Sequence, residues 1–184
     1  MIVNKIKWED FKTSEWSGGT TTEVLIIPED SDVGQRNFDL RVSTATCDLK
    51  ESIFSDYSGY KRYIAPVDGE LELNVNGRKL LLSPYEVLEF SGSDDVTGYS
   101  IVRDYNLIIR EGIAAVMISK ELRDVTNITL DGNYLLQCFD SDLRYETNND
   151  SGILKKGDAL SILDGAGILR LYTEESRFVF IIKY

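Results

Sequence analysis

Apolar and polar residues alternate with a period of two along most of this chain, and helical periodicity is almost absent. In residues 70–75, for example, glutamate or asparagine alternates with leucine or valine. This pattern is typical of a β-strand with one buried face, because successive side chains of a strand point to opposite sides. The stretch ends in Asn76-Gly77, the pair that best tolerates the positive φ angles of a type I′ turn. Residues 78–82 are therefore predicted to return as the second strand of a hairpin.

The same pattern predicts strands along the whole chain, bounded by clusters of Gly, Ser, Asp or Pro that are typical of turns. The predicted strands cover residues 24–27, 38–47, 87–90, 98–102 and 106–110 in a first series, and residues 114–118, 127–130, 134–139, 161–163, 168–172 and 178–182 in a second. Only residues 119–125 are interpreted as a helical turn. We therefore predict an all-β protein of barrels or sandwiches, with a first unit over residues 1–112 and a smaller one over residues 113–184.

The composition of 42% hydrophobic and 28% charged residues, over a length of 184, is typical of a globular protein with one large domain or two small ones. The formal net charge is −11, and no segment concentrates enough Lys and Arg to attract a polyphosphate backbone, so nucleic acid is not expected as a partner. The N-terminus lacks the apolar core of a signal peptide, and no apolar run approaches the roughly 18 residues that span a bilayer. The sequence therefore predicts a cytoplasmic protein without a membrane partner.

The chain contains no histidine. This removes the commonest transition-metal ligand and the usual base of serine and cysteine nucleophiles. Cys47 and Cys138 lie far apart, lack a metal-like spacing and are predicted to be buried free thiols. Neither a metal nor a cofactor is therefore predicted. What remains is a binding-type site built from backbone amides, hydroxyls, arginines and carboxylates.

A glycine-containing segment ahead of the first apolar strand is one candidate for such a site. It consists of Trp16, Ser17, Gly18, Gly19, Thr20, Thr21, Thr22 and Glu23. Two consecutive glycines let backbone N–H groups converge on an anion, the hydroxyls add donors, and the tryptophan offers an apolar wall. The alternative is a tight turn whose threonines enter a strand, and the residues alone favour this alternative.

The strand predicted over residues 38–47 carries a second candidate. Leu40 and Val42 belong to its apolar face, which leaves Arg41 and Ser43 on the other face. In a barrel this face borders the lumen, where an arginine would hold a carboxylate with two hydrogen bonds and a serine hydroxyl would complete the contact. We favour this arrangement over a solvent-exposed face with a surface ion pair of little energetic value.

Three further side chains are candidate ligand-binding residues. Arg62 is a second candidate anion clamp, although its neighbour Lys61 makes a solvated basic pair equally plausible. Asn106 stands at the start of an apolar strand, where asparagine is rare, so it requires a polar partner or a ligand. Glu23 is predicted to pair with Arg41 or Arg62; the alternative is a general base, because burial raises a carboxylate pKa.

Four motifs follow one another along the first part of the chain. They are Trp16-Ser17-Gly18-Gly19 with Thr20, Thr22 and Glu23; Phe38-Asp39-Leu40-Arg41-Val42-Ser43-Thr44-Ala45; Phe54-Ser55 leading to Gly59-Tyr60-Lys61-Arg62; and Asp104-Tyr105-Asn106-Leu107. In order and spacing they resemble the HutD/Ves family. The resemblance covers residues 1–112 by motif and the remainder by its β pattern. It implies a double-stranded β-helix in each half, a bicupin-like fold that lacks the histidine metal site of cupins.

The resemblance also implies a binding function. Some members of the family are linked to histidine utilisation, with a role in sensing or handling an acidic intermediate such as formylglutamate, and others to stress responses. We therefore expect the first barrel to bind a small anionic metabolite, with regulatory or scavenging consequences. Arg41 and Arg62 are expected as charge partners, Ser43 and Asn106 as hydrogen-bond donors, and residues 16–20 as a lid or nest.

Two alternatives from other classes stay open. One is a metal-free cupin enzyme, an isomerase or epimerase, with Glu23 or a tyrosine as the proton carrier. The other is an assembly module whose lumen is filled by side chains such as Tyr60, Tyr63 or Phe90. A homodimer formed through edge strands is compatible with each of these functions.

Overall fold

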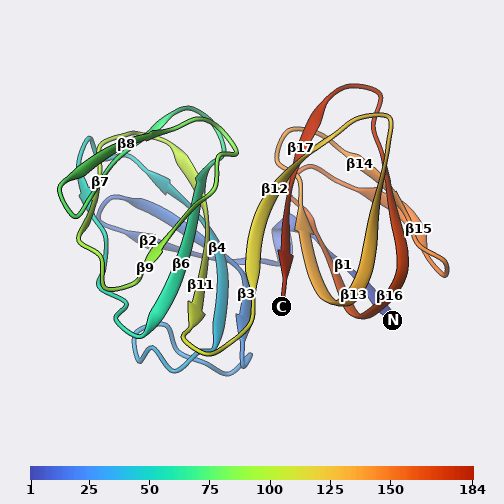
Figure 1. Cartoon of the computed structure of the whole chain (residues 1–184), viewed down its shortest axis with the longest axis horizontal. Helices are drawn as coiled ribbons and strands as arrows, with labels where there is room; N and C mark the ends of the chain where they lie inside the picture. The colour runs from blue at the N-terminus through green and yellow to red at the C-terminus, as the bar shows by residue number, and fades with distance from the viewer. The chain divides into compact units, whose positions relative to one another are not determined.

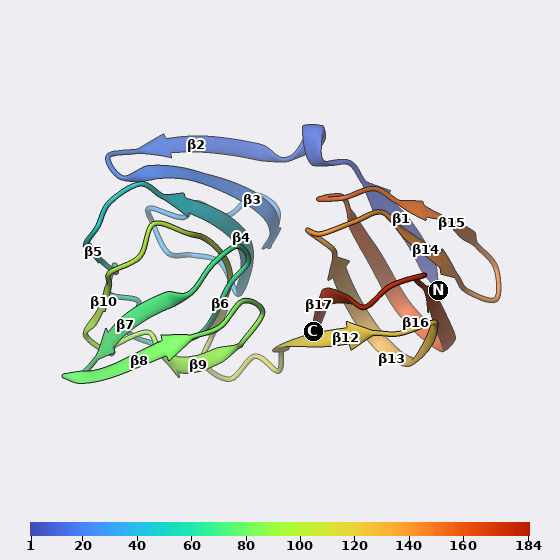
Figure 2. The ribbon, with the colours of Figure 1, turned by 90° about the horizontal axis from the view of Figure 1, so that it is seen from above.

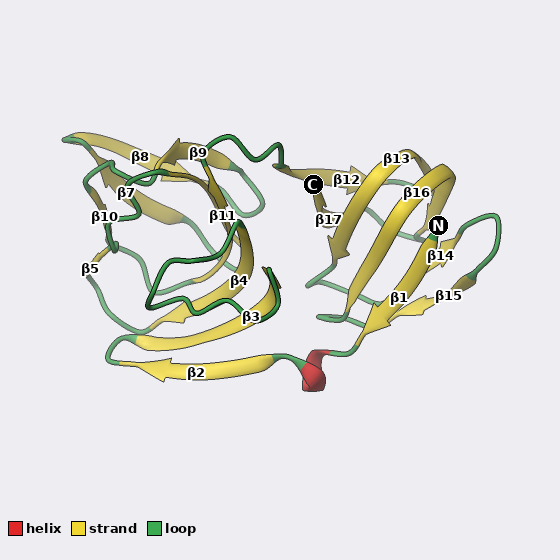
Figure 3. Cartoon of the chain, turned by 90° about the horizontal axis from the view of Figure 1, so that it is seen from below, coloured by secondary structure: helices red, strands yellow, loops and turns green.

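The computed structural model describes every residue from Met1 to Tyr184, and strands dominate it (Figure 1). The helical element is the short 3-10 turn η1 (Trp8–Asp10), drawn red in Figure 3. No helix is long and apolar enough to cross a membrane. The chain forms two compact units, one of residues 12–113 and one of residues 1–11 with 114–184. The prediction of an all-β protein is confirmed.

The unit of residues 12–113 consists of two antiparallel sheets. In Figure 2, β2, β3 and β4 of one sheet lie across the unit from β7 and β8 of the other. The larger sheet has the order β2 (Lys12–Trp16), β3 (Gly19–Ile27), β4 (Leu40–Cys47), β11 (Arg103–Arg110), β6 (Tyr60–Pro66) and β9 (Leu88–Ser91). The smaller sheet has the order β5 (Ser52–Ile53), β10 (Val96–Gly98), β7 (Leu71–Val75) and β8 (Arg78–Leu82). Because β11 pairs with both β4 and β6, strands that are distant in sequence are joined in the centre of the larger sheet.

The apolar residues of this unit form two buried clusters. One cluster includes Ile64 from the larger sheet together with Leu71 and Leu73 from the smaller sheet. The other consists of Phe38, Tyr60 and Ile108, with the rings of Phe38 and Tyr60 5.0 Å apart. The first cluster holds the two sheets together through apolar burial, and the second packs within the larger sheet and its loops.

The hairpin of β7 and β8 has the turn that its sequence predicts. Asn76 and Gly77 have φ angles of 52° and 84°, the two positive values that a type I′ turn requires. Val75 lies opposite Arg78 across the turn. The predicted hairpin is therefore confirmed, register included.

The unit of residues 1–11 and 114–184 is built on one sheet. Its strand order is β12 (Val116–Leu122), β17 (Arg177–Lys183), β13 (Val125–Gln137), β16 (Ala159–Tyr172), β14 (Leu143–Glu146) and β15 (Ser151–Leu154), with β1 (Ile2–Ile6) also paired to β16. The buried core of the unit includes Leu122, Leu136, Leu160 and Ile181, which come from four different strands.

The unit boundaries differ from the predicted ranges 1–112 and 113–184 at the N-terminus. The structure assigns the first eleven residues to the second unit, because β1 pairs with β16 from Ile2 opposite Leu163 to Ile6 opposite Ala159. The later boundary lies after residue 113. An alternating pattern identifies a strand but carries no information about the distant strand that completes its ladder.

Two local predictions are wrong. Residues 119–125 form no helical turn, because β12 extends to Leu122 and pairs with β17, where Ser119 lies opposite Phe180. An isolated helix of this length is marginal, so pairing with the apolar strand β17 prevails. The strand predicted over residues 98–102 ends at Gly98, after three residues that pair with β7.

Four predicted strands of the second half join into two long ones. Residues 127–130 and 134–139 fall largely on β13, and residues 161–163 and 168–172 fall on β16. A register shift between Gly132 and Tyr134 interrupts the pairing of these two strands at the point where the prediction placed a turn. The turn-like residues in the middle of β13 therefore mark a β-bulge.

Candidate functional site

The unit of residues 12–113 contains a cavity of about 610 Å³. Both sheets contribute to its walls, through alternate residues of β2, β3, β4 and β11 and through residues of β5 and β7. Arg62 of β6, Gly98 of β10 and loop residues within 31–34, 54–57 and 100–102 complete the lining. A volume of this size is in the range of sites for small molecules.

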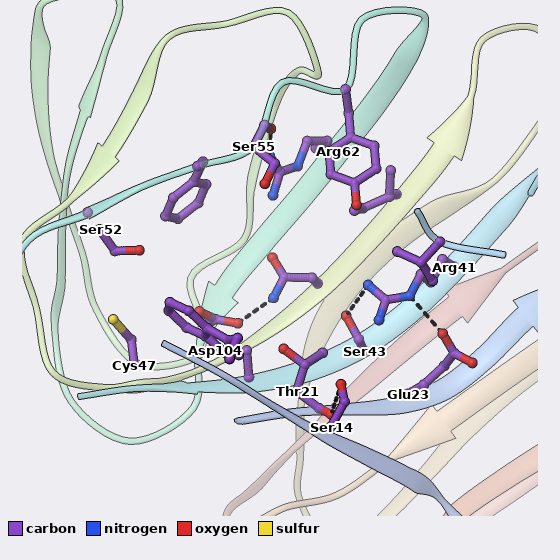
Figure 4. A pocket seen from close by; sticks show the side chains of 18 of the residues that line it. Ser14, Thr21, Glu23, Arg41, Ser43, Cys47, Ser52, Ser55, Arg62 and Asp104 are labelled. Carbon is purple, nitrogen blue, oxygen red and sulfur yellow. Dashed lines mark hydrogen bonds and ion pairs between the residues drawn. The ribbon is translucent and has the colours of Figure 1, made fainter. Parts of the chain in front are cut away.

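Side-chain alternation on β4 and β11 brings polar residues into the cavity. Arg41 and Ser43 line it from β4, and Asp104 and Asn106 line it from β11. The ladder between these strands places Asn106 directly opposite Ser43. The structure therefore places Arg41 and Ser43 on the lumen side of their strand, and Figure 4 shows both side chains at the cavity wall.

Arg41 is already paired in the cavity. Its Nε donates a hydrogen bond of 2.9 Å to Oε2 of Glu23, and its Nη1 lies 3.5 Å from Oγ of Ser43 (Figure 4). The two charged side chains are only 12% and 22% exposed. Glu23 is thus the ion-pair partner of Arg41, the role that the sequence favoured over that of a general base. A guanidinium neutralised in this way is a weak anion clamp.

Arg62 on β6 has a different environment, because no carboxylate forms an ion pair with it. The residue is 8% exposed, and its single hydrogen bond is donated by Nη1 to the backbone oxygen of Ser55, 3.2 Å away. The guanidinium carbon lies 5.2, 5.3 and 5.0 Å from the ring centroids of Phe54, Tyr57 and Phe90. Burial lowers the pKa of Arg62 to about 10, with Tyr57 and Asp104 acting in the opposite direction. Arg62 is therefore a charged, desolvated group with unused donors in the cavity.

Asp104 is a cavity residue that the sequence did not single out as part of the site. Its carboxylate is buried and accepts a short hydrogen bond from Nδ2 of Asn106. Burial raises the pKa of Asp104 to about 7, against the hydrogen bond from Asn106 and the charge of Arg62, which lower it. This carboxyl group therefore titrates near neutral pH, well above an ordinary aspartate.

Strand alternation contains a signal for Asp104 that the sequence interpretation did not use. Asn106 is unusual because asparagine is rare in strands. Asp104 lies two residues earlier, on the same face of the same strand. The isomerase alternative required a buried acid that faces the same cavity as the arginines. Both Glu23 and Asp104 line the cavity, but Glu23 is paired with Arg41, whereas Asp104 is buried without an ion pair.

The glycine segment forms the hairpin turn between β2 and β3. Trp16 lines the cavity, but Ser17, Gly18, Gly19 and Thr20 do not. A Cβ on Gly18 would lie 2.2 Å from the Trp16 ring, and one on Gly19 would lie 2.0 Å from the backbone oxygen of Thr46. Thr20 on β3 lies opposite Thr46 on β4, and their Oγ1 atoms are 2.8 Å apart. Close packing therefore explains the two glycines.

Two glycine variants test whether close packing requires the glycine at position 19. Gly19→Ala is expected to destabilise the protein by about 3 kcal/mol or more, because the methyl group meets backbone and φ at this residue is 149°. Gly77→Ala is the matched control, since its φ of 84° is also positive but nothing lies within 4 Å, and about 1 kcal/mol is expected. Urea unfolding of both variants measures the difference. Equal losses at the two positions would contradict the packing argument.

The aromatic side chains named as a plug of the lumen do not line the cavity. Tyr60 packs against Phe38, and Phe90 lies against the guanidinium of Arg62. Tyr63 is buried on the same strand as Arg62 but is also absent from the lining. The lumen next to Arg62 therefore stays open, which argues against an assembly module with a filled cavity.

Metal-ligating groups do not gather in this protein. No group of three His, Cys, Asp or Glu side chains comes together in the structure. Within the cavity, the acids are Glu23, Asp32 and Asp104, and Glu23 is held by Arg41. The polar chemistry of the cavity therefore consists of guanidinium, ammonium, carboxyl, amide, hydroxyl and thiol groups.

Facing antiparallel sheets around a polar lumen, in a chain with two all-β units, define a cupin-like protein of the bicupin class. Solved structures with this fold align over the whole chain. They include PA5104, a conserved protein of unknown function from Pseudomonas aeruginosa PAO1, with 22% identity, a TM-score of 0.87 and coverage of 100% of this chain and 98% of that one. The chain belongs to the HutD family, whose model matches residues 8–180.

Two further structures agree with this fold. HutD from Pseudomonas fluorescens SBW25 aligns with a TM-score of 0.78 and 22% identity over 99% of this chain and 98% of that one. The pirin YhhW from Escherichia coli, in complex with nickel(II), aligns with a TM-score of 0.69 and 10% identity over 99% and 98% of the two chains. No curated protein matches the sequence. The resemblance in the motifs is thereby confirmed at the level of family and fold.

Proposed function

We propose that the cavity of residues 12–113 binds a small metabolite through a carboxylate group, and that Arg62 is the residue that holds it. The consequence of binding would be regulation or scavenging of that metabolite in the cytoplasm. Arg41, which the sequence ranked beside Arg62, takes a secondary part because Glu23 already neutralises it.

The observation that carries this proposal is the state of Arg62. A buried charge without a counterion is unfavourable, and proteins normally pair or hydrogen-bond such groups. Arg62 has one hydrogen bond to a neutral backbone oxygen and three aromatic rings around it. A carboxylate from a ligand would accept two parallel hydrogen bonds from the guanidinium and neutralise it. The rings would restrict the guanidinium to one orientation.

The rest of the lining fits a small polar molecule with an apolar part. Ser43, Asn106 and the hydroxyl of Ser52 offer hydrogen bonds, and Leu71 and Ile108 offer apolar surface. A few convergent polar groups in a largely apolar wall are typical of metabolite sites. The link of the HutD family to histidine utilisation supports a ligand from amino-acid metabolism.

Isothermal titration calorimetry with a panel of small carboxylates tests the proposal. The panel contains acetate, succinate, glutarate, free amino acids and N-acetyl amino acids. At least one member is expected to bind the wild-type protein. Arg62→Gln is expected to weaken that binding at least 30-fold, because truncating one partner of a buried charge pair costs about 2 kcal/mol or more.

Arg78→Gln is the matched control, since Arg78 lies exposed at the β7–β8 turn, away from the cavity lining. It is expected to bind like the wild type. The proposed function is wrong if no carboxylate in the panel binds the folded wild-type protein, or if Arg62→Gln binds as well as Arg78→Gln.

A further inference from the structure

Arg62 and Asp104 are opposite charges that share one cavity without pairing with each other. Both residues line the cavity, and both are at most 9% exposed. No ion pair joins them, although each still acts electrostatically on the other. They come from the neighbouring strands β6 and β11, where Arg62 lies opposite Ile108 and Asp104 lies opposite Pro66. The cavity therefore holds a separated positive and negative group.

Each of these charges lacks a full partner in the ligand-free protein. Burial is the largest influence on both, and it disfavours the charged form of each. A ligand with a carboxylate alone would neutralise Arg62 but would bring a second negative charge toward Asp104. A ligand that carries both signs would neutralise both groups at once.

Asn106 is oriented to assist a positively charged group beside Asp104. Its Nδ2 donates to the Asp104 carboxylate, which leaves its carbonyl oxygen as an acceptor without a hydrogen bond in the protein. Ser43, opposite Asn106 in the ladder, adds a hydroxyl oxygen to the same wall. An ammonium group has three N–H donors, and these acceptors come from two adjacent strands.

Resting on the proposed function, we propose that the ligand is a zwitterion, a small amino acid with a free amino group. Its carboxylate binds Arg62, and its ammonium group binds Asp104 with Asn106 as a second acceptor. The specificity of the site for amino acids over simple carboxylates resides in Asp104.

The charge of the whole cavity agrees with a ligand without net charge. The charged residues of the lining are three cations and three anions: Lys12, Arg41, Arg62, Glu23, Asp32 and Asp104. Arg41 and Glu23 cancel each other in an ion pair. A site built for a purely anionic ligand would instead show an excess of positive charge.

The proposal predicts the sign of the pH dependence. An ammonium group binds the ionised carboxylate, so affinity for an amino acid rises as pH rises through 7, the pKa of Asp104. A ligand with a carboxylate but no ammonium group favours the neutral acid, so its affinity falls over the same range. The charged groups that act on Asp104 are Arg62 on β6 and Asp68 in the β6–β7 turn, and Ala45 on β4 contributes an uncharged backbone hydrogen bond.

The experiment compares matched ligands by calorimetry at pH 8 and pH 5.5. Each free L-amino acid is titrated beside its N-acetyl derivative and the carboxylate that lacks the amino group. The free amino acid is expected to bind at least tenfold more tightly than either analogue at pH 8. Its binding is expected to weaken about 30-fold at pH 5.5, because only about 3% of Asp104 is then ionised.

Asp104→Asn keeps the shape of the side chain and is expected to abolish both the preference and its pH dependence. Asp95→Asn, which removes an exposed acid of the same unit outside the cavity lining, is the matched control and is expected to retain both. Thermal unfolding checks that each variant is folded. The zwitterion proposal is overturned, and the proposed function survives, if the N-acetyl or amine-free ligand binds as well as the amino acid at pH 8. Failure of every carboxylate to bind would instead remove the proposed function itself.

Discussion

Replacement of Arg62 by methionine is expected to abolish carboxylate binding while leaving the protein at least as stable as the wild type. The loss of binding is expected to exceed 100-fold, because methionine offers no donor to a carboxylate. The free energy of unfolding is expected to stay the same or to rise by up to about 2 kcal/mol, since replacing a buried charge by an apolar group of similar size is often neutral or stabilising.

The surroundings of Arg62 favour this outcome. A methionine side chain would occupy the space between Phe54, Tyr57 and Phe90, where a thioether makes favourable contacts with aromatic rings. Arg62→Met loses a single hydrogen bond, the one to the Ser55 backbone oxygen, and residue 55 is exposed to water. A residue kept at the expense of stability is the signature of a functional site.

Arg110→Met provides the opposite case on the same sheet. The Arg110 side chain donates to Asp39 at 3.0 Å and to the Phe38 oxygen at 2.8 Å, and it lies outside the cavity lining. This variant is expected to lose about 1–3 kcal/mol of stability and to bind like the wild type. Urea unfolding and calorimetry on both variants check the contrast. If Arg62→Met unfolds more easily than Arg110→Met, Arg62 is a structural residue and not a ligand anchor.

Asp104 is expected to make the wild-type protein less stable as the pH rises from 4 to 8, by on the order of 4 kcal/mol. The pKa of Asp104 is about 7 in the folded state, against 3.8 for an unperturbed aspartate. Between these values the folded protein holds a proton that the unfolded chain has released, so rising pH favours unfolding. Below pH 4 both states are protonated, and above pH 7 the contribution is lost.

The difference in unfolding free energy between the wild type and Asp104→Asn isolates this contribution, because asparagine does not titrate. Urea unfolding at pH 4, 5, 6, 7 and 8 measures it. Asp56→Asn is the control in the same unit: the hydrogen bonds from Ser58 lower the pKa of Asp56, so its difference from the wild type must not fall with pH. A wild-type minus Asp104→Asn difference that stays level across this range would show that Asp104 is not desolvated.

The direction in which side chains point could be predicted from the sequence for the strands that form the cavity. Alternation alone separated Arg41 and Ser43 from the apolar Leu40 and Val42, and the structure has the two polar residues at the cavity wall. The type I′ turn at residues 76–77 was equally local, because two adjacent residues determine it. Features that depend on a few neighbouring residues are those that sequence patterns specify.

The environment of each charge could not be predicted in the same way. Arg41 and Arg62 are alike in sequence terms, yet Glu23 on β3 neutralises one, whereas aromatic rings from the β5–β6 loop and from β9 surround the other. The burial of Asp104 results from the packing of both sheets, which no local pattern encodes. The reason for the glycine at position 19 could not be predicted either, since the atoms that exclude a side chain there belong to Thr46 on another strand.

The pairing of β1 with β16 has a consequence for how the two units arise during synthesis. Residues 12–113 are one uninterrupted stretch of chain and can fold as soon as they have emerged from the ribosome. β1 must wait for a partner that is made more than 150 residues later, since Ile6 pairs with Ala159. Closing so long a loop is slow, and the waiting strand is exposed meanwhile to other unpaired strands. The polar residues Asn4 and Lys5 in the middle of β1 would help keep this nascent segment from aggregating.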